Sequence, residues 1–139
     1  MASYDVRIRL GDSSSAGVDP AKLVLKHHLA DRAEVHAEAL SGGHLLHLSV
    51  AGCLFNAILR EARSRGIAVT DLQISAEGDF GGEPSTSTRI TYSVDLAGEA
   101  PEDELRKLVA ECEELVPIPL TLERGARIQA GAIGIRSEA

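Results

Sequence analysis

The sequence predicts an α+β fold in which an antiparallel sheet wraps a long buried central helix and a second amphipathic helix. Three observations support this prediction. Apolar and polar residues alternate in residues 5–10 and again in residues 88–96, which is typical of half-buried strands. Residues 45–59 are apolar on nearly every side of a helix, so protein must enclose them. Apolar residues recur at helical spacing in residues 105–116, which predicts the second helix.

The expected strands precede and follow the central helix along the chain. Residues 6–10 form the first strand, residues 23–25 a second, and residues 34–36 a short third one. Two longer strands, residues 69–80 and 88–96, are joined by the glycine-rich link 81–85, which reads as a hairpin loop. A last strand is expected at residues 128–135. Strands that surround a helix in this order indicate an α+β arrangement.

Local signals mark where both helices begin and end. Ser41 is a plausible cap for the central helix, and Gly66 suits the left-handed position that follows its last turn. Pro101 opens the second helix, with three acidic residues in its first turn. Cys112 falls in the apolar stripe of this helix, and Pro117 and Pro119 are expected to end it.

Size and charge limit the function classes. The chain of 139 residues forms a single domain (residues 1–139), and it is short for enclosing a central helix alone, so we expect a homodimer. A net charge of −7 argues against nucleic acid and anionic membranes as partners. The apolar run is shorter than the roughly 20 residues of a membrane span, and no signal peptide is recognisable, so we expect a cytoplasmic protein. Two cysteines do not make a structural disulfide framework there, although they could form a transient redox pair.

Cys53, near the middle of the central helix, is either a small core residue or a reactive thiol in a protected pocket. Reactivity requires the thiolate, and Cys53 lies too deep in the helix for the helix N-terminus to act strongly on it. An arginine from another segment or subunit would have to stabilise the thiolate, and Arg7, Arg9 and Arg32 are the candidates. Cys112 is either core filler or a resolving thiol that attacks a sulfenic acid on Cys53.

Five histidines raise the question of a metal site: His27, His28, His36, His44 and His47. The pair at positions 44 and 47 would share a helix face, but Cys53 lies about 240° further round, so one helix cannot direct all three at one ion. We therefore expect no metal. A proton donor at position 44 or 47 for Cys53 stays an alternative.

Two segments resemble the OsmC/Ohr family of thiol-dependent hydroperoxide reductases. The run Leu45-Leu46-His47-Leu48-Ser49-Val50-Ala51-Gly52-Cys53 is similar to the family's "ELL…A…AGC" helix, which ends at the peroxidatic cysteine. The segment Val116-Pro117-Ile118-Pro119-Leu120-Thr121-Leu122 is similar to the family's "CP(I/V)…TL" segment. The resemblance implies an intertwined homodimer with two sites at the subunit interface and no cofactor.

The chain departs from the family pattern at two site positions. Val116 occupies the place of the family's second cysteine, and Cys112 lies one helical turn earlier. The family's glutamate, which orients the active-site arginine, should fall near Gly43. Without these groups, attack on peroxide should be slower, and a sulfenic acid on Cys53 would depend on Cys112 or an external thiol.

The leading functional hypothesis is reduction of organic hydroperoxides by Cys53, with Cys112 or an external dithiol as reductant. The alternative is a non-catalytic domain that binds a small hydrophobic molecule in a pocket at the dimer interface. A metal-dependent hydrolase built on the histidines is a third hypothesis.

Overall fold

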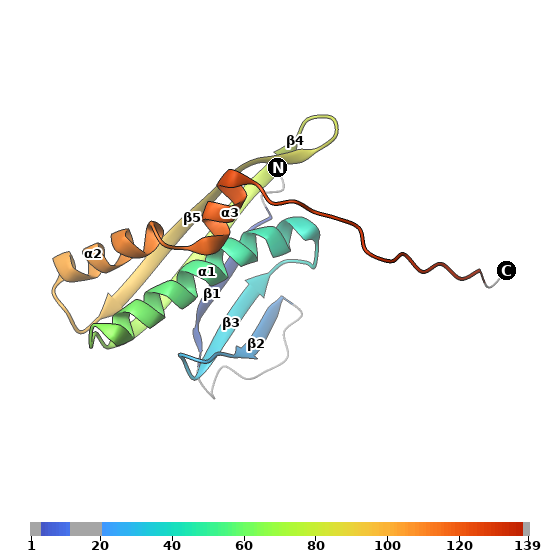
Figure 1. Cartoon of the computed structure of the whole chain (residues 1–139). Helices are drawn as coiled ribbons and strands as arrows, with labels where there is room; N and C mark the ends of the chain where they lie inside the picture. The colour runs from blue at the N-terminus through green and yellow to red at the C-terminus, as the bar shows by residue number, and fades with distance from the viewer. Residues whose placement is uncertain (1–3, 12–20, 138–139) are drawn as a thin grey trace.

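The computed structural model describes residues 4–11 and 21–137, and its elements follow the predicted order as far as the second helix. The elements are β1 (Val6–Gly11), β2 (Lys22–Lys26), β3 (Arg32–Ala37), α1 (Gly42–Ser64), β4 (Val69–Gly81), β5 (Thr86–Gly98), α2 (Glu102–Glu113) and α3 (Pro117–Arg124) (Figure 1). The glycine- and serine-rich run Gly11-Asp12-Ser13-Ser14-Ser15-Ala16-Gly17 predicts a turn, and apart from Gly11 this run lies outside the described residues.

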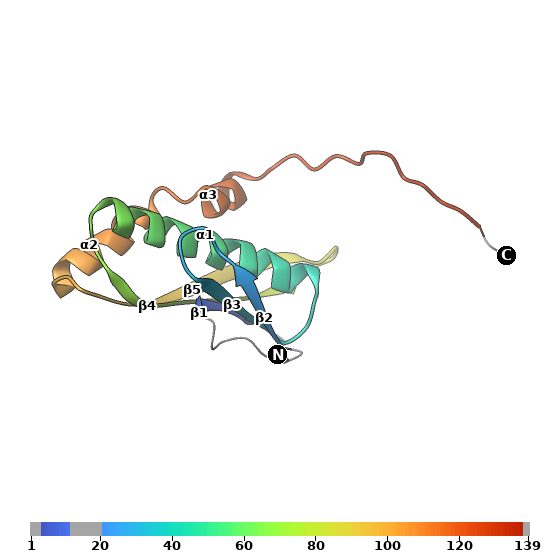
Figure 2. The ribbon, with the colours of Figure 1, turned by 90° about the horizontal axis from the view of Figure 1, so that it is seen from below.

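The five strands form one antiparallel sheet in the order β2-β3-β1-β4-β5, and the three helices lie on one side of it (Figure 2). The register places Ile8 opposite both Val35 and Ile74, so their side chains share the face under α1. Arg7 is opposite His36 and Ser75, and these side chains share the outer face. The sheet therefore has an apolar inner face and a polar outer face, as the alternation in the sequence predicts.

Helix α1 begins and ends at the predicted signals. The Oγ of Ser41 accepts a hydrogen bond from the backbone N–H of His44 at 3.2 Å, which satisfies one of the free donors of the first turn. After the last turn, Gly66 has a φ of +69°, a conformation that favours glycine. Leu54 and Ile58 are fully buried, whereas Leu45 is 53% exposed. The expectation that protein encloses this helix on nearly every side is therefore not met within one chain.

By length and composition alone, helix α1 could cross a membrane. Its buried residues pack against the sheet and α2, as those of a core helix do. The core helix of a globular protein can have the same length and composition.

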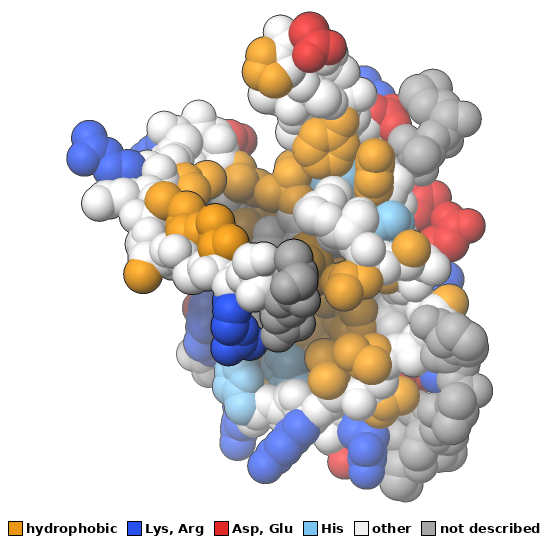
Figure 3. Space-filling model, turned by 90° about the vertical axis from the view of Figure 1, so that its right-hand side faces the viewer, with side chains coloured by type: hydrophobic (Ala, Val, Ile, Leu, Met, Phe, Trp, Pro, Cys, Tyr) orange, Lys and Arg blue, Asp and Glu red, His pale blue; other side chains and the backbone are white. Residues whose placement is uncertain are grey.

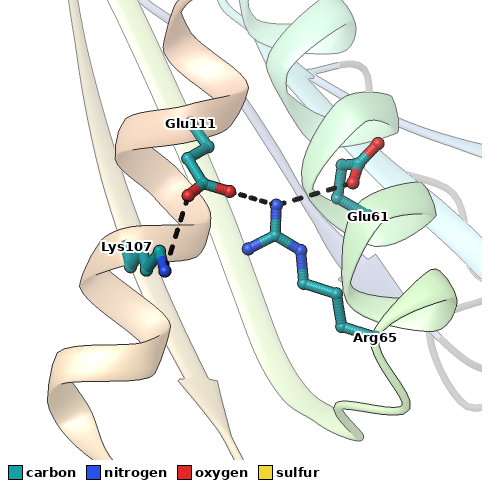
Figure 4. A network of polar contacts seen from close by, with 4 residues as sticks. All are labelled: Glu61, Arg65, Lys107 and Glu111. Atoms are coloured by element: carbon teal, nitrogen blue, oxygen red, sulfur yellow. Dashed lines mark hydrogen bonds and ion pairs between the residues drawn. The ribbon is translucent and has the colours of Figure 1, made fainter.

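Helix α2 covers the C-terminal half of α1 with the face that carries Leu108 and Cys112, both buried. Polar contacts fix this packing at its edge: the Arg65 guanidinium donates to Glu111 and lies 3.6 Å from Glu61 (Figure 4). Glu111 in turn pairs with Lys107 at 3.9 Å.

The C-terminal part differs from the prediction in two ways. Pro117 and Pro119 open a third helix, α3, because proline is compatible with the first helical turn, where backbone N–H groups have no partner. The strand expected at residues 128–135 is not formed: residues 125–137 have no regular secondary structure and run away from the body (Figures 1 and 2). A strand needs a neighbour for its hydrogen bonds, and this segment lies beside no strand of the part of the chain that the structure describes.

Candidate active site around Cys53

Cys53 is a half-buried free thiol on the side of α1 that the sheet leaves partly open. We call this side the open stripe and define it by Leu45, Leu48, Ser49, Cys53 and Asn56, all of them at least partly exposed. Hydrophobic side chains also gather on the face of the molecule from which the C-terminal segment projects (Figure 3). A thiol in such a place is accessible to small molecules and flanked by apolar surface.

A histidine is hydrogen-bonded to Asn56, which lies one helical turn after the thiol. The backbone N–H of Leu29 donates to Nδ1 of His27 at 3.0 Å, so the proton of the neutral ring is on Nε2. That Nε2–H donates to Oδ1 of Asn56 at 2.5 Å. The His27 ring also meets the Phe55 ring edge-on, with centroids 5.2 Å apart. Asn56 is one helical turn after Cys53 and is held in one orientation from outside the helix.

Aromatic rings fill the position where the family glutamate was expected. A Cβ atom on Gly43 would lie 2.7 Å from Cδ1 of Tyr4 and 2.9 Å from Cε2 of Phe80. The Tyr4 ring meets the rings of His44 and Phe80 edge-on, each at a centroid distance of 5.2 Å. Glycine at position 43 thus allows these rings to close over the first turn of α1, and a glutamate side chain has no room there.

His44 and His47 belong to this aromatic cluster and not to the surroundings of Cys53. Nδ1 of His47 donates to the backbone carbonyl of Tyr4 at 2.9 Å, and the ring is completely buried beneath Gly78. His44 precedes Cys53 by nine residues, about 13 Å along the helix axis. The geometry gives no support to the alternative of a proton donor from either residue.

The three candidate arginines lie on the outer face of the sheet. Arg7 and Arg9 alternate with Val6 and Ile8, whose buried side chains face α1, and Nε of Arg9 lies 4.0 Å from Glu34. Arg32 precedes Glu34 by two residues on β3 and shares its face. The sheet separates all three from the thiol of the same chain.

Cys112 is buried in the hydrophobic core, on the face of α2 that packs against α1. Burial and the carboxylate of Glu61 raise the pKa of its thiol, against the opposing effect of Arg65. Glu61, the residue of α1 near Cys112, follows Cys53 by eight residues, which is about 12 Å along the helix axis. A disulfide between Cys53 and Cys112 would need their Cα atoms within about 7 Å of each other. The catalytic roles of both cysteines stay predictions, and this placement makes a direct exchange between them within one chain difficult.

Within the described ranges 4–11 and 21–137, no group of three or more histidine, cysteine or acidic side chains could hold a metal ion. His27 and His28 stack with ring centroids 4.7 Å apart, while His36 lies across the sheet on its outer face and pairs with Glu34 at 3.4 Å.

Sequence comparison matches residues 35–130 to the family described as OsmC-like protein, which is more than half of the chain. This chain belongs to the OsmC-like family. The family assignment confirms the resemblance inferred from the residues around Cys53 and after α2. No curated protein matches the chain in a sequence search.

A solved structure supports the fold of this OsmC-like chain. It is the crystal structure of an OsmC-like hydroperoxide resistance protein from Jannaschia sp. CCS1, with a TM-score of 0.53 and 18% sequence identity. The match covers 98% of this chain and 95% of that one, so the two chains share the α+β fold.

Sequence reasoning missed two features of the site. The sequence pattern pointed to His27 only as a possible metal ligand and did not single out Asn56. The polarity of Asn56, one turn after a cysteine, was the available signal. Tyr4 gave no signal, because its contact with Gly43 depends on how the first strand enters the sheet.

Proposed function

We propose that this OsmC-like protein reduces organic hydroperoxides with Cys53 as the nucleophile. The observation that carries the proposal is the position of Cys53: a half-buried free thiol on the open stripe of the core helix, at the end of the segment that resembles the family's peroxidatic-cysteine helix. The hydroperoxide resistance protein with the same fold supports the same chemistry.

In the proposed reaction the Cys53 thiolate attacks the terminal oxygen of a hydroperoxide ROOH. A sulfur–oxygen bond forms and the O–O bond breaks, which leaves Cys53 as sulfenic acid and releases an alkoxide that takes a proton to become the alcohol. An external dithiol then attacks the sulfenic acid, releases water and forms a mixed disulfide. Its second thiol displaces Cys53, so the dithiol ends as a disulfide. We favour the external dithiol over Cys112 because Cys112 is buried beside Glu61.

We further propose that the active species is a homodimer in which a second copy covers the open stripe. Leu23 and Leu25, on the helix side of the sheet at strand β2, are 57% and 47% exposed. Ile128 and Ile135 in the C-terminal segment are 95% and 90% exposed. Apolar side chains exposed to this extent favour association, and a segment without a strand neighbour of its own can pair with the sheet of a partner.

The test is dithiol-dependent consumption of cumene hydroperoxide by the wild type, Cys53→Ser and Cys112→Ala. We expect activity in the wild type, complete loss with Cys53→Ser and little change with Cys112→Ala. Activity in Cys53→Ser equal to that of the wild type would refute the proposal.

A second candidate is a non-catalytic pocket for a small hydrophobic molecule. The rings of Tyr4 and Phe80 at Gly43, together with the outward-facing arginines, favour it, because the groups expected to activate the thiol are displaced. It predicts saturable binding of an apolar fluorescent dye that Cys53→Trp abolishes, without hydroperoxide consumption. Dye binding that Cys53→Trp leaves unchanged would reject it.

A further inference from the structure

We propose that Asn56, whose amide oxygen is held by His27, turns its N–H group to the sulfur of Cys53 when the thiolate forms and stabilises that thiolate. The inference rests on the proposed function, in which Cys53 is the nucleophile. It assigns the role of thiolate stabilisation to two residues of the same chain, in a protein whose candidate arginines lie behind the sheet.

The first step is the position of the Asn56 side chain. Residues three apart on a helix have Cβ atoms about 5–6 Å from one another, and helical side chains lean towards the N-terminus. The Asn56 side chain therefore leans over the turn that carries Cys53. Both residues are partly exposed, so they lie on the same open side of α1.

The second step is the orientation of the carboxamide. Because Nε2–H of His27 donates to Oδ1 of Asn56, the amide oxygen is turned towards the loop between β2 and β3. The amide NH₂ group is then directed away from His27. An oxygen in that place would repel a thiolate, whereas an N–H group donates to it.

The third step is what fixes the histidine. Nδ1 of His27 accepts from the backbone N–H of Leu29, and the ring packs against Phe55 and stacks on His28. In this tautomer the ring can only donate to Asn56. A chain of hydrogen bonds thus runs from the Leu29 backbone through His27 to the carboxamide of Asn56. Asn56 would touch the reacting sulfur, and His27 would be a positioning residue.

The experiment measures alkylation of Cys53 by iodoacetamide between pH 5 and pH 10, with the modified peptide quantified by mass spectrometry. At pH 7, Asn56→Ala should slow the alkylation of Cys53 about threefold to tenfold, since a hydrogen bond to a charged group is lost. The rise of the alkylation rate with pH should occur at higher pH in this variant than in the wild type. His27→Ala should have a smaller effect in the same direction. His27→Gln should restore part of the rate, because its amide can donate to Asn56. The matched control is His36→Ala, because His36 lies on the outer face of the sheet, away from α1 and Cys53.

Asn56→Asp is a second variant of nearly the same shape, which keeps the test valid if Asn56→Ala fails to fold. A carboxylate at this position repels the thiolate, so the rise of the alkylation rate with pH should occur at still higher pH than in Asn56→Ala. Wild-type alkylation rates and pH profiles in folded Asn56 variants would overturn the inference. The readout needs no peroxide, so failure of the proposed function is seen separately: Cys53 would then depend on Asn56 for alkylation and yet consume no hydroperoxide.

Discussion

The Tyr4 ring occupies the space that a side chain at position 43 would need, with its Cδ1 atom 2.7 Å from where a Cβ on Gly43 would lie. An aromatic cluster therefore stands at the start of α1, where the resemblance had led us to expect a glutamate that orients an arginine.

Substitution at Gly43 should therefore destabilise the fold. We expect Gly43→Ala to cost about 1–3 kcal/mol of the free energy of unfolding, because the rings of Tyr4 and Phe80 must move. Urea denaturation measures this. The matched control is Gly42→Ala, where a Cβ would meet nothing within 4 Å and helix propensity should raise stability by up to about 1 kcal/mol. Equal effects of the two substitutions would contradict the packing described here.

The two thiols should differ in reactivity. Cys112 is 1% exposed and burial raises the pKa of its thiol, so iodoacetamide should modify Cys53 at least about tenfold faster in the folded protein at pH 7. Peptide mass spectrometry distinguishes the two sites, and in urea both should react at similar rates. Faster modification of Cys112 in the folded protein would contradict its assignment to the core.

Stability should fall in mildly acidic solution through His36. Burial and the guanidinium of Arg7 lower the pKa of His36 from 6.5, against the opposing effect of Glu34. The folded state then binds its proton less readily than the unfolded state. The contribution to stability is complete above pH 6.5 and is lost as the pH falls towards the lowered pKa. Thermal unfolding from pH 5 to pH 8 should show a shallower dependence in His36→Gln than in the wild type. The control is His28→Gln, since the His28 side chain is exposed. If the unfolding temperature of His36→Gln depended on pH as strongly as that of the wild type, this assignment would be refuted.

The C-terminal segment should control assembly. A chain that ends at Arg124 removes Ile128, Ile133 and Ile135, which are 95%, 77% and 90% exposed, and we expect it to be a monomer. Light scattering coupled to size-exclusion chromatography measures the mass, and a full-length variant with these three isoleucines changed to serine controls for chain length. A full-length wild type that is monomeric at micromolar concentration would contradict the proposed homodimer.

Much of the fold could be predicted from local patterns. Alternation in β1, the Ser41 cap and the glycine at position 66 each act through their own segment, and the structure has all three. The last strand could not be placed correctly, because strand formation depends on a neighbour and not on the pattern of Ile128 and its successors. The family was predicted from the residues that end at Cys53.

Less of the candidate site than of the fold could be predicted from the sequence. Period-two alternation in β1 already placed Arg7 and Arg9 on the face away from the apolar residues, so the arginine hypothesis could have been tested on the sequence. The His27–Asn56 bond joins residues 29 positions apart, and nothing local to either residue predicts it.

The most direct test of the central claim is to trap the product of the first chemical step. Reduced protein receives one equivalent of cumene hydroperoxide in the presence of dimedone, which reacts with sulfenic acids, and the peptides are analysed by mass spectrometry. We predict a dimedone adduct on Cys53 together with one equivalent of cumyl alcohol, and neither from Cys53→Ser. Unmodified Cys53 and intact hydroperoxide in the wild-type reaction would contradict the account.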